Sequence, residues 1–178
     1  MRNVVVTEFI SLDGVIENPG WTFPYWNDEI AAFKAEETNA ADALLLGRVT
    51  YEGFAAAWPQ SSDEGAPYMN SVAKYVATRT LTNLEWNNSH VLEGDVVEAV
   101  KRLKQQDGRD ILVYGSMTLS QTLMQHDLVD VYRFLVYPVV LGTGMRFFQD
   151  GNNLKLNLVS SQQFSSGVVG LIYHPART

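Results

Sequence analysis

The chain has 178 residues, a net charge of −7 and no cysteine. This length is typical of one domain that buries enough apolar surface to fold without covalent links. The composition excludes disulfides, thiolate metal sites and a cysteine nucleophile, and it argues against a broad interface with nucleic acid or an anionic membrane. The three histidines lack metal-ligand spacing, so we expect no bound metal. We also expect the chain to be one soluble cytoplasmic domain over residues 1–178.

Residues 4–10 are rich in β-branched side chains, which predicts a central, buried first strand. After the turn pair Asp13-Gly14, a loop carries four aromatic residues within positions 21–26. This loop forms either a lid or pocket wall, or a cover over the edge of the core. A helix is expected to start at Asn27 or Asp28, either of which can cap it, and to run to about Asn39.

A first strand-to-helix turn is predicted at Gly47. The apolar run over residues 43–46 indicates a buried parallel strand, and Val49, Phe54 and Trp58 follow at helical spacing. Free N–H groups at the start of a helix can bind phosphate, and Arg48 and Thr50 add a planar cation and a hydroxyl donor. The alternative is that Gly47 only makes the turn, Thr50 only caps the helix and Arg48 is a solvated surface charge.

Residues 74–79 predict another short strand, which ends in Thr78 and Arg79. A hydroxyl and a guanidinium there suit a second phosphate, such as the ribose 2′-phosphate that distinguishes NADP from NAD. Ordinary surface residues at a strand end explain the pair equally well. A strand over residues 90–92 and a helix containing Val97, Val100 and Leu103 are expected next.

The strand-glycine-helix pattern occurs a second time. An apolar strand over residues 110–114 leads into Gly115, Ser116, Met117 and Thr118 and then a helix. Two helix N-termini at the carboxyl ends of parallel strands can hold two parts of one dinucleotide. Neither turn is a G-x-G-x-x-G fingerprint, so a standard Rossmann domain is not supported.

The last third of the chain predicts antiparallel strands. A long strand is expected over residues 128–137, and the segments 154–164 and 168–174 resemble the arms of a hairpin. The fold class is therefore α/β, with a mostly parallel central sheet, flanking helices and an antiparallel C-terminal hairpin. Because residues 131–141 carry more apolar side chains than one sheet face needs, we also expect a homodimer.

Four motifs give a resemblance to the dihydrofolate reductase superfamily. They are Ser-Leu-Asp-Gly at 11–14, Leu-Gly-Arg-x-Thr-x-Glu at 46–52, Ile-x-Val-x-Gly at 111–115 and Leu-Val-Asp at 128–130. The first motif and residues 138–144 are more similar to the carboxy-terminal reductase domain of bacterial bifunctional riboflavin-biosynthesis proteins. The chain resembles a stand-alone relative of that domain, which implies a three-layer dihydrofolate-reductase-like fold.

The resemblance implies NADPH as the hydride donor, bound by ten residues. Gly47, Arg48 and Thr50 match positions near the pyrophosphate, Thr78 and Arg79 match the 2′-phosphate site, Gly115, Ser116, Met117 and Thr118 match the second turn, and Ile16 matches the apolar side chain that backs the nicotinamide. In true dihydrofolate reductases the second turn is typically Gly-Gly with a cis peptide bond. Here it is Gly115-Ser116, so the isomer is left open.

Glu29 matches the carboxylate that binds the pterin, and it could help to deliver a proton during reduction. The implied activity is reduction of a small heterocycle or a ribosylaminopyrimidine, as in 5-amino-6-(5-phosphoribosylamino)uracil reductase. Arg146 or Arg133 could supply a phosphate subsite for such a substrate. Dihydrofolate reductase activity, and NADP binding without physiological catalysis, are the two alternatives.

Overall fold

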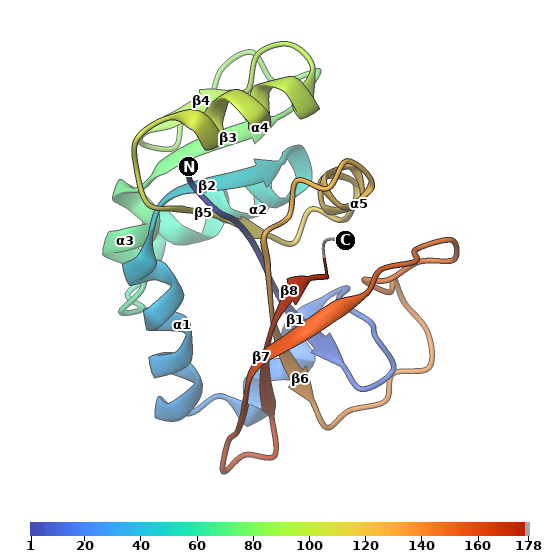
Figure 1. Ribbon diagram of the computed structural model, residues 1–178. Coiled ribbons are helices and arrows are strands. Elements are labelled where there is room, and N and C mark those ends of the chain that lie inside the picture. Colours follow the sequence, from blue (N-terminus) through green and yellow to red (C-terminus); the bar gives the residue numbers. More distant parts are fainter. Residues whose placement is uncertain (177–178) are drawn as a thin grey trace.

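The computed structural model describes residues 1–176, which form an eight-stranded sheet in the order β4-β3-β2-β5-β1-β6-β8-β7 (Figure 1). The strands are β1 (Val4–Ser11), β2 (Ala41–Gly47), β3 (Ala73–Ala77), β4 (Ser89–Val91), β5 (Asp110–Tyr114), β6 (Val131–Tyr137), β7 (Leu156–Gln163) and β8 (Val169–Pro175). Strands β4 to β6 in this order are parallel, whereas β8 is antiparallel to both β6 and β7. The mostly parallel sheet, the central first strand and the antiparallel hairpin are confirmed.

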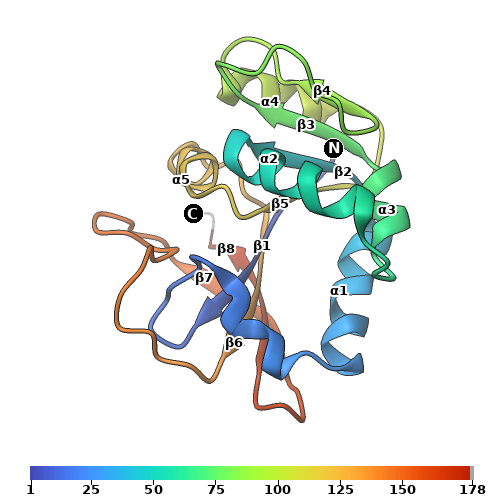
Figure 2. The ribbon, with the colours of Figure 1, turned by 180° about the vertical axis from the view of Figure 1, so that it is seen from behind.

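Helices cover both faces of the sheet and give three layers. They are α1 (Asp28–Ala40), α2 (Arg48–Ala57), α3 (Ala66–Ser71), α4 (Val96–Gln105) and α5 (Met117–Gln125), with 3-10 helices η1 (Pro19–Tyr25) and η2 (Trp58–Gln60). Helices α4 and α5 lie on one face and α1, α2 and α3 on the other, as the two opposite views show (Figures 1 and 2). None of the helices in residues 1–176 has the length and apolar character needed to cross a bilayer.

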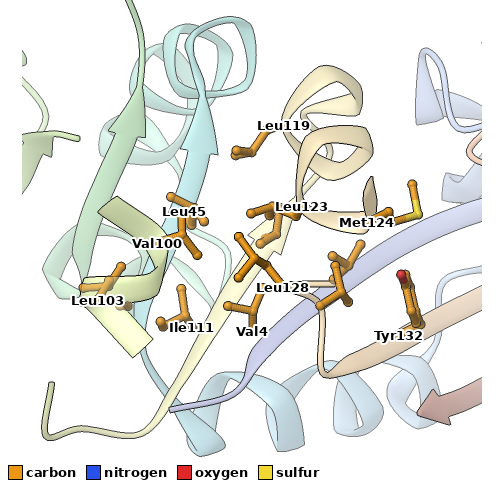
Figure 3. Close-up of a cluster of buried hydrophobic side chains, with 14 of the residues drawn as sticks. Val4, Leu45, Val100, Leu103, Ile111, Leu119, Leu123, Met124, Leu128 and Tyr132 are labelled. Atoms are coloured by element: carbon orange, nitrogen blue, oxygen red, sulfur yellow. The ribbon is translucent and has the colours of Figure 1, made fainter. Parts of the chain in front are cut away.

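The largest part of the core lies between the sheet and helices α4 and α5 (Figure 3). Alternate residues of the strands point into it, together with one face of each helix. They include Val4, Leu45, Val100, Leu103, Ile111, Leu119, Leu123, Met124, Leu128 and Tyr132. Each fully buried aliphatic side chain of this kind contributes about 1.5–3 kcal/mol. This packing holds the N-terminus of α5 against the carboxyl ends of β2 and β5.

Three local features differ from the sequence-based expectation. Strand β6 starts at Val131 rather than at residue 128, because the preceding Asp130 uses its side chain to accept a hydrogen bond from the Val4 backbone (2.8 Å). Strand β3 ends at Ala77, so the expected strand residues 78 and 79 lie beyond it. Val49 shares helical spacing with the half-buried Phe54 and Trp58, but it is 71% exposed.

The apolar side chains of β6 are buried within one chain. Tyr132 and Phe134 enter the cluster under α5, whereas Leu135 and Tyr137 enter the cluster under α1. The strand is also paired on both edges, with β1 and with β8. The apolar surplus of β6 therefore has an explanation that needs no second chain, and the homodimer stays a prediction.

The segment over residues 78–88, between β3 and β4, folds back over Lys74. The Lys74 ammonium donates hydrogen bonds to the carbonyls of Val72 (2.7 Å) and Asn87 (2.9 Å), and it lies 4.2 Å from the centre of the Trp86 ring. The whole Lys74 side chain is buried, which lowers its pKa to about 8.

Candidate cofactor and active site

The two strand-to-helix turns meet at the carboxyl ends of β2 and β5. The backbone N–H of Gly47 donates to the Ser116 hydroxyl (2.8 Å), and that hydroxyl donates to Thr50 Oγ1 (2.8 Å). A Cβ atom at Gly47 would lie 3.1 Å from Ser116 Oγ, so a larger residue would push the turns apart. The N-termini of α2 and α5 are thereby held side by side, with their free N–H groups at one place.

The second turn has a left-handed backbone. Gly115 has φ of 54° and Ser116 has φ of 57°, and no cis peptide bond occurs within residues 1–176. The open question about the Gly115-Ser116 bond is therefore answered in favour of trans. A Cβ at Gly115 would lie 3.2 Å from Thr50 Oγ1, which gives a second reason for glycine at this position.

A cavity of about 790 Å³ lies in front of these turns. Its volume falls within the roughly 300–1,000 Å³ that small-molecule sites occupy. Eight of the ten residues expected to bind the cofactor line it, namely Gly47, Arg48, Thr50, Thr78, Arg79, Ser116, Met117 and Thr118. The lining also includes Asp95, His126 and Met145, which were not expected there.

The other two expected cofactor residues lie next to the cavity rather than in its lining. Gly115 immediately precedes the lining residue Ser116. Ile16 donates its backbone N–H to the carbonyl of Met145 (2.9 Å), which lines the cavity, and its side chain packs against the same apolar cluster as Met117. Met117 and Met145 line the cavity with Ile16 next to them, and Thr78, Arg79 and Asp95 line it from the end of β3 and the start of α4.

The two arginines of the cavity differ in their availability. Arg48 forms an exposed ion pair with Glu52 (2.8 Å) one helical turn away. The guanidinium of Arg79 is exposed and has no hydrogen bond or ion pair within residues 1–176. The hydroxyl of Thr78, next to it, accepts the backbone N–H groups of Thr80 and Leu81 (both 3.1 Å). Arg79 is therefore a cation that is free to bind an anion.

Glu29 lies away from the cavity lining, in the first turn of α1. Its carboxylate accepts hydrogen bonds from the hydroxyl and the backbone N–H of Ser165, in the β7–β8 turn, and from the Asn27 side chain. The hydrogen bonds from Ser165 lower the pKa of Glu29, so the group is ionised at neutral pH. Glu29 thus connects α1 to the β7–β8 turn through hydrogen bonds, and its role as a catalytic acid stays a prediction.

The aromatic loop covers the edge of the core. The rings of Trp21 and Tyr25 meet Tyr137 edge-on at 5.5 and 5.8 Å, and Trp26 meets Phe9 at 6.2 Å. None of these rings is in the lining of the large cavity. The contacts of these three rings agree with the cover over the core, whereas the fourth aromatic residue, Phe23, is 78% exposed.

The two arginines suggested for a substrate phosphate are in different environments. Arg133 is largely buried, pairs with Glu37 (3.2 Å) and donates to the carbonyl of Phe33 (3.1 Å). Its charge is therefore already neutralised within the chain. Arg146 donates to the carbonyl of Asp13 (2.9 Å), but half of its side chain remains exposed. Only Arg146 keeps a surface that an external phosphate can reach.

A buried polar network under α1 was not foreseen from the sequence. Glu37 accepts hydrogen bonds from Thr7 (2.9 Å) and Tyr114 (3.1 Å) and pairs with Lys34 and Arg133. In the sequence, Lys34 and Glu37 have the spacing of an ordinary exposed helix pair, and no local signal distinguishes them from one.

Glu8 was also missed, because it stands in a run that the sequence marks only as a buried strand. Burial raises its pKa to about 8, although Lys34 and the backbone N–H of Gly115 act in the opposite direction. A carboxyl group in a strand interior gives no sequence signal of its own, so only the structure shows what surrounds it.

The sheet between two layers of helices and the paired glycine turns form a dihydrofolate-reductase-like fold. The fold matches a dihydrofolate reductase from Enterococcus faecalis complexed with NADP(H), with a TM-score of 0.65, 14% identity and coverage of 98% of this chain and 97% of that one. More particularly, the chain belongs to the RibD C-terminal domain family, whose model matches residues 2–170.

Two other proteins are similar over nearly their whole length. The uncharacterized protein YyaP of Bacillus subtilis (strain 168) is 30% identical over 179 residues, which cover 97% of this chain and 95% of YyaP. A putative riboflavin biosynthesis protein from Shewanella sp. PV-4 has a crystal structure that matches with a TM-score of 0.79 and 22% identity, over 98% of this chain and 99% of that one. The dihydrofolate-reductase-like fold and the relation to riboflavin reductases are confirmed.

Proposed function

We propose that this protein is an NADPH-dependent reductase of a small heterocycle or a ribosylaminopyrimidine, similar to 5-amino-6-(5-phosphoribosylamino)uracil reductase. The observation that carries the proposal is the cavity at the joined turns of Gly47 and Ser116, where two helix N-termini face one space. Membership of the RibD C-terminal domain family supports the reaction class.

The residues around the cavity fit a dinucleotide phosphate. Gly47 and Gly115 leave room at the turns, and the N–H groups at the starts of α2 and α5 are suited to the pyrophosphate, with Arg48, Thr50, Ser116, Met117 and Thr118 beside them. Thr78 and the unpaired Arg79 are suited to a 2′-phosphate. At the other end, Ile16 provides an apolar wall for the nicotinamide. NADPH supplies a hydride, and the chain orients the ring and supplies the proton.

The first experiment is a calorimetric titration of the purified protein with NADPH and with NADH. We expect micromolar NADPH binding, and we expect Arg79→Ala to weaken it about tenfold, since a charge-assisted hydrogen bond is worth about 1.5–3 kcal/mol. NADH affinity should change less than twofold. Arg102→Ala, another exposed arginine outside the cavity, is the matched control and should change neither affinity.

The outcomes separate the parts of the proposal. If neither nucleotide binds, the reductase proposal is wrong and only the fold remains. If NADH binds as tightly as NADPH, the 2′-phosphate assignment of Thr78 and Arg79 is wrong, and Asp95 at the same side of the cavity would explain the result by binding a ribose hydroxyl.

Two alternative functions remain testable with the same protein. Oxidation of NADPH in the presence of dihydrofolate, but not of a phosphoribosylaminopyrimidine, would identify a dihydrofolate reductase, and Glu29→Gln should then abolish turnover while leaving NADPH affinity nearly unchanged. Tight NADPH binding without turnover of either acceptor would favour a nucleotide-binding protein without physiological catalysis. The half-exposed Arg146 is our candidate for binding a substrate phosphate.

We also propose that the protein is a homodimer. The support is the outer strand β7, which pairs only with β8 within residues 1–176 and is exposed along most of its length. Leu158 and Val159 on this strand are 55% and 54% exposed. An exposed strand edge with apolar side chains is a surface that a second chain can cover.

A further inference from the structure

Glu8 is the first residue of β1 beyond the end of its pairing with β5. The pairing of β1 with β5 ends at Thr7 and Tyr114, whereas its pairing with β6 continues to Ser11 and Tyr137. From Glu8 onward, β1 therefore has no strand on its β5 side, and the turn that starts at Gly115 leaves the sheet there. The chain after β5 enters α5 on one face, and the chain after β1 leads to α1 on the other. Ligands of open α/β sheets bind at such a divergence.

The Glu8 side chain belongs to the face covered by α5. Its neighbours at alternate positions, Val6 and Ile10, are both in the cluster beneath that helix, and Ile16 and Met117 pack against the same cluster. Met117 lines the cavity, and the Ile16 backbone N–H donates a hydrogen bond to the carbonyl of Met145, which also lines it. Glu8 therefore lies on the side of the sheet where Met117 lines the cavity, and the backbone N–H of Gly115, which acts on its carboxyl group, directly precedes the lining residue Ser116.

The carboxyl group of Glu8 is buried, and one of its two oxygens has no hydrogen-bond partner within residues 1–176. The residue is 8% exposed, and its Oε1 atom is buried without a hydrogen-bond partner within residues 1–176. The charged groups that act on it are Lys34 and Glu37 of α1, together with the backbone N–H of Gly115. Burial outweighs the attraction of Lys34, so Glu8 carries a proton at neutral pH.

We propose that Glu8 is the acid at the nicotinamide end of the cavity and that its proton accompanies the hydride to the substrate. This inference rests on the proposed function. Hydride adds to the carbon of a C=N bond while the Glu8 proton adds to the nitrogen, the π bond breaks, and the products are the C–H and N–H bonds, NADP⁺ and the Glu8 carboxylate. Glu8 then regains a proton from solvent.

The proposal has a consequence for binding alone. The nicotinamide ring is neutral in NADPH and positively charged in NADP⁺, so only the oxidised form attracts an ionised carboxylate. If Glu8 lies beside the ring, NADP⁺ binding displaces the Glu8 proton near neutral pH, and NADPH binding does not. This difference can be measured without knowing the substrate.

The experiment is isothermal titration calorimetry of the full chain with NADP⁺ and with NADPH, near pH 7 in two buffers of different ionisation enthalpy. We expect NADP⁺ to release about half a proton more than NADPH from the wild-type protein. Glu8→Gln should abolish that difference, whereas Glu36→Gln, an exposed glutamate of α1, should retain it. Equal release from wild type and Glu8→Gln would overturn the inference, as would loss of the difference in Glu29→Gln alone.

A second measurement covers the case in which Glu8→Gln does not fold. Carboxyl ¹³C NMR of the wild-type protein should show one glutamate that titrates near pH 8, and NADP⁺ should lower that midpoint by about one pH unit while NADPH leaves it in place. If neither nucleotide shifts the midpoint of this titration, the role of Glu8 is overturned but the reductase proposal is left intact. Failure of both nucleotides to bind overturns the proposed function, and this inference with it.

Discussion

At the scale of single residues, Glu8 links the stability of the protein to pH. Its pKa is raised from 4.5 to about 8, so the native state keeps a proton that the unfolded chain has already lost between these pH values. The stabilising contribution is complete below pH 4.5 and disappears as the pH rises toward 8. Glu8→Gln cannot ionise. We therefore expect it to gain stability relative to wild type by about 4 kcal/mol between pH 5 and pH 8.5.

Urea unfolding at several pH values measures this change. The relevant quantity is the difference in the free energy of unfolding between Glu8→Gln and the wild type, because the other titrating groups are common to both. Glu36→Gln should give a curve parallel to that of the wild type. Parallel curves for Glu8→Gln as well would mean that Glu8 is already ionised in the native protein.

The residue scale is also where sequence-based reasoning reached its limit. Gly47, Arg79 and Ser116 could be selected because a glycine turn before a helix and a cation at a strand end are local patterns, and the structure brings them to one cavity. The state of Glu8 depends on where β5 ends, and the burial of Glu37 depends on Arg133, almost a hundred residues away. Such properties are not encoded in the neighbouring sequence.

At the scale of the elements, α4 carries two lysines with opposite surroundings. Lys104 is buried, pairs with Asp130 and donates to the carbonyl of Leu128 (3.2 Å), which joins α4 to the start of β6. Lys101, on the same helix, forms a solvent-exposed pair with Glu98. We expect Lys104→Ala to cost about 3 kcal/mol, because it removes the cation that neutralises the largely buried Asp130 carboxylate. Lys101→Ala should cost less than about 0.5 kcal/mol.

Thermal or denaturant unfolding of the two variants tests this contrast. Each replaces the same residue type in the same helix, so the difference in helix propensity cancels. Similar losses of stability would show that the Lys104–Asp130 pair does not anchor the helix to the sheet.

Element boundaries were predicted well where a local signal sets them. Asn27 caps α1 with its side chain, which accepts the Ile30 N–H (3.0 Å), and β5 occupies the expected residues 110–114. The start of β6 was placed three residues too early, because Leu128 and Val129 are as apolar as the strand itself. The start of β6 is set by the contact of Asp130 with Val4 of β1, which lies near the beginning of the sequence.

At the scale of the whole molecule, the remaining question is assembly. If β7 forms the contact between two chains, charge on its exposed apolar positions should separate them. We expect wild-type protein to be a dimer at micromolar concentration in light scattering, and Val159→Lys to be a monomer with unchanged NADPH affinity. Gln162→Lys, on the same exposed strand, is a control for added charge.

A monomeric wild-type protein at that concentration would contradict the dimer. A dimer that persists in Val159→Lys would retain the assembly but move the contact away from β7. The exposed residues Leu12 and Val140 would then be the next positions to substitute.

The enclosure of Lys74 makes it a chemical reporter of motion beside the cavity. An amine with a pKa near 8 is a good nucleophile in mildly alkaline solution, yet no reagent can reach this one while residues 78–88 cover it. Acylation of Lys74 therefore requires that segment to lift, and the labelling rate measures how often it does so. Because the same segment carries Arg79, a nucleotide that holds Arg79 in place would also slow the acylation of Lys74.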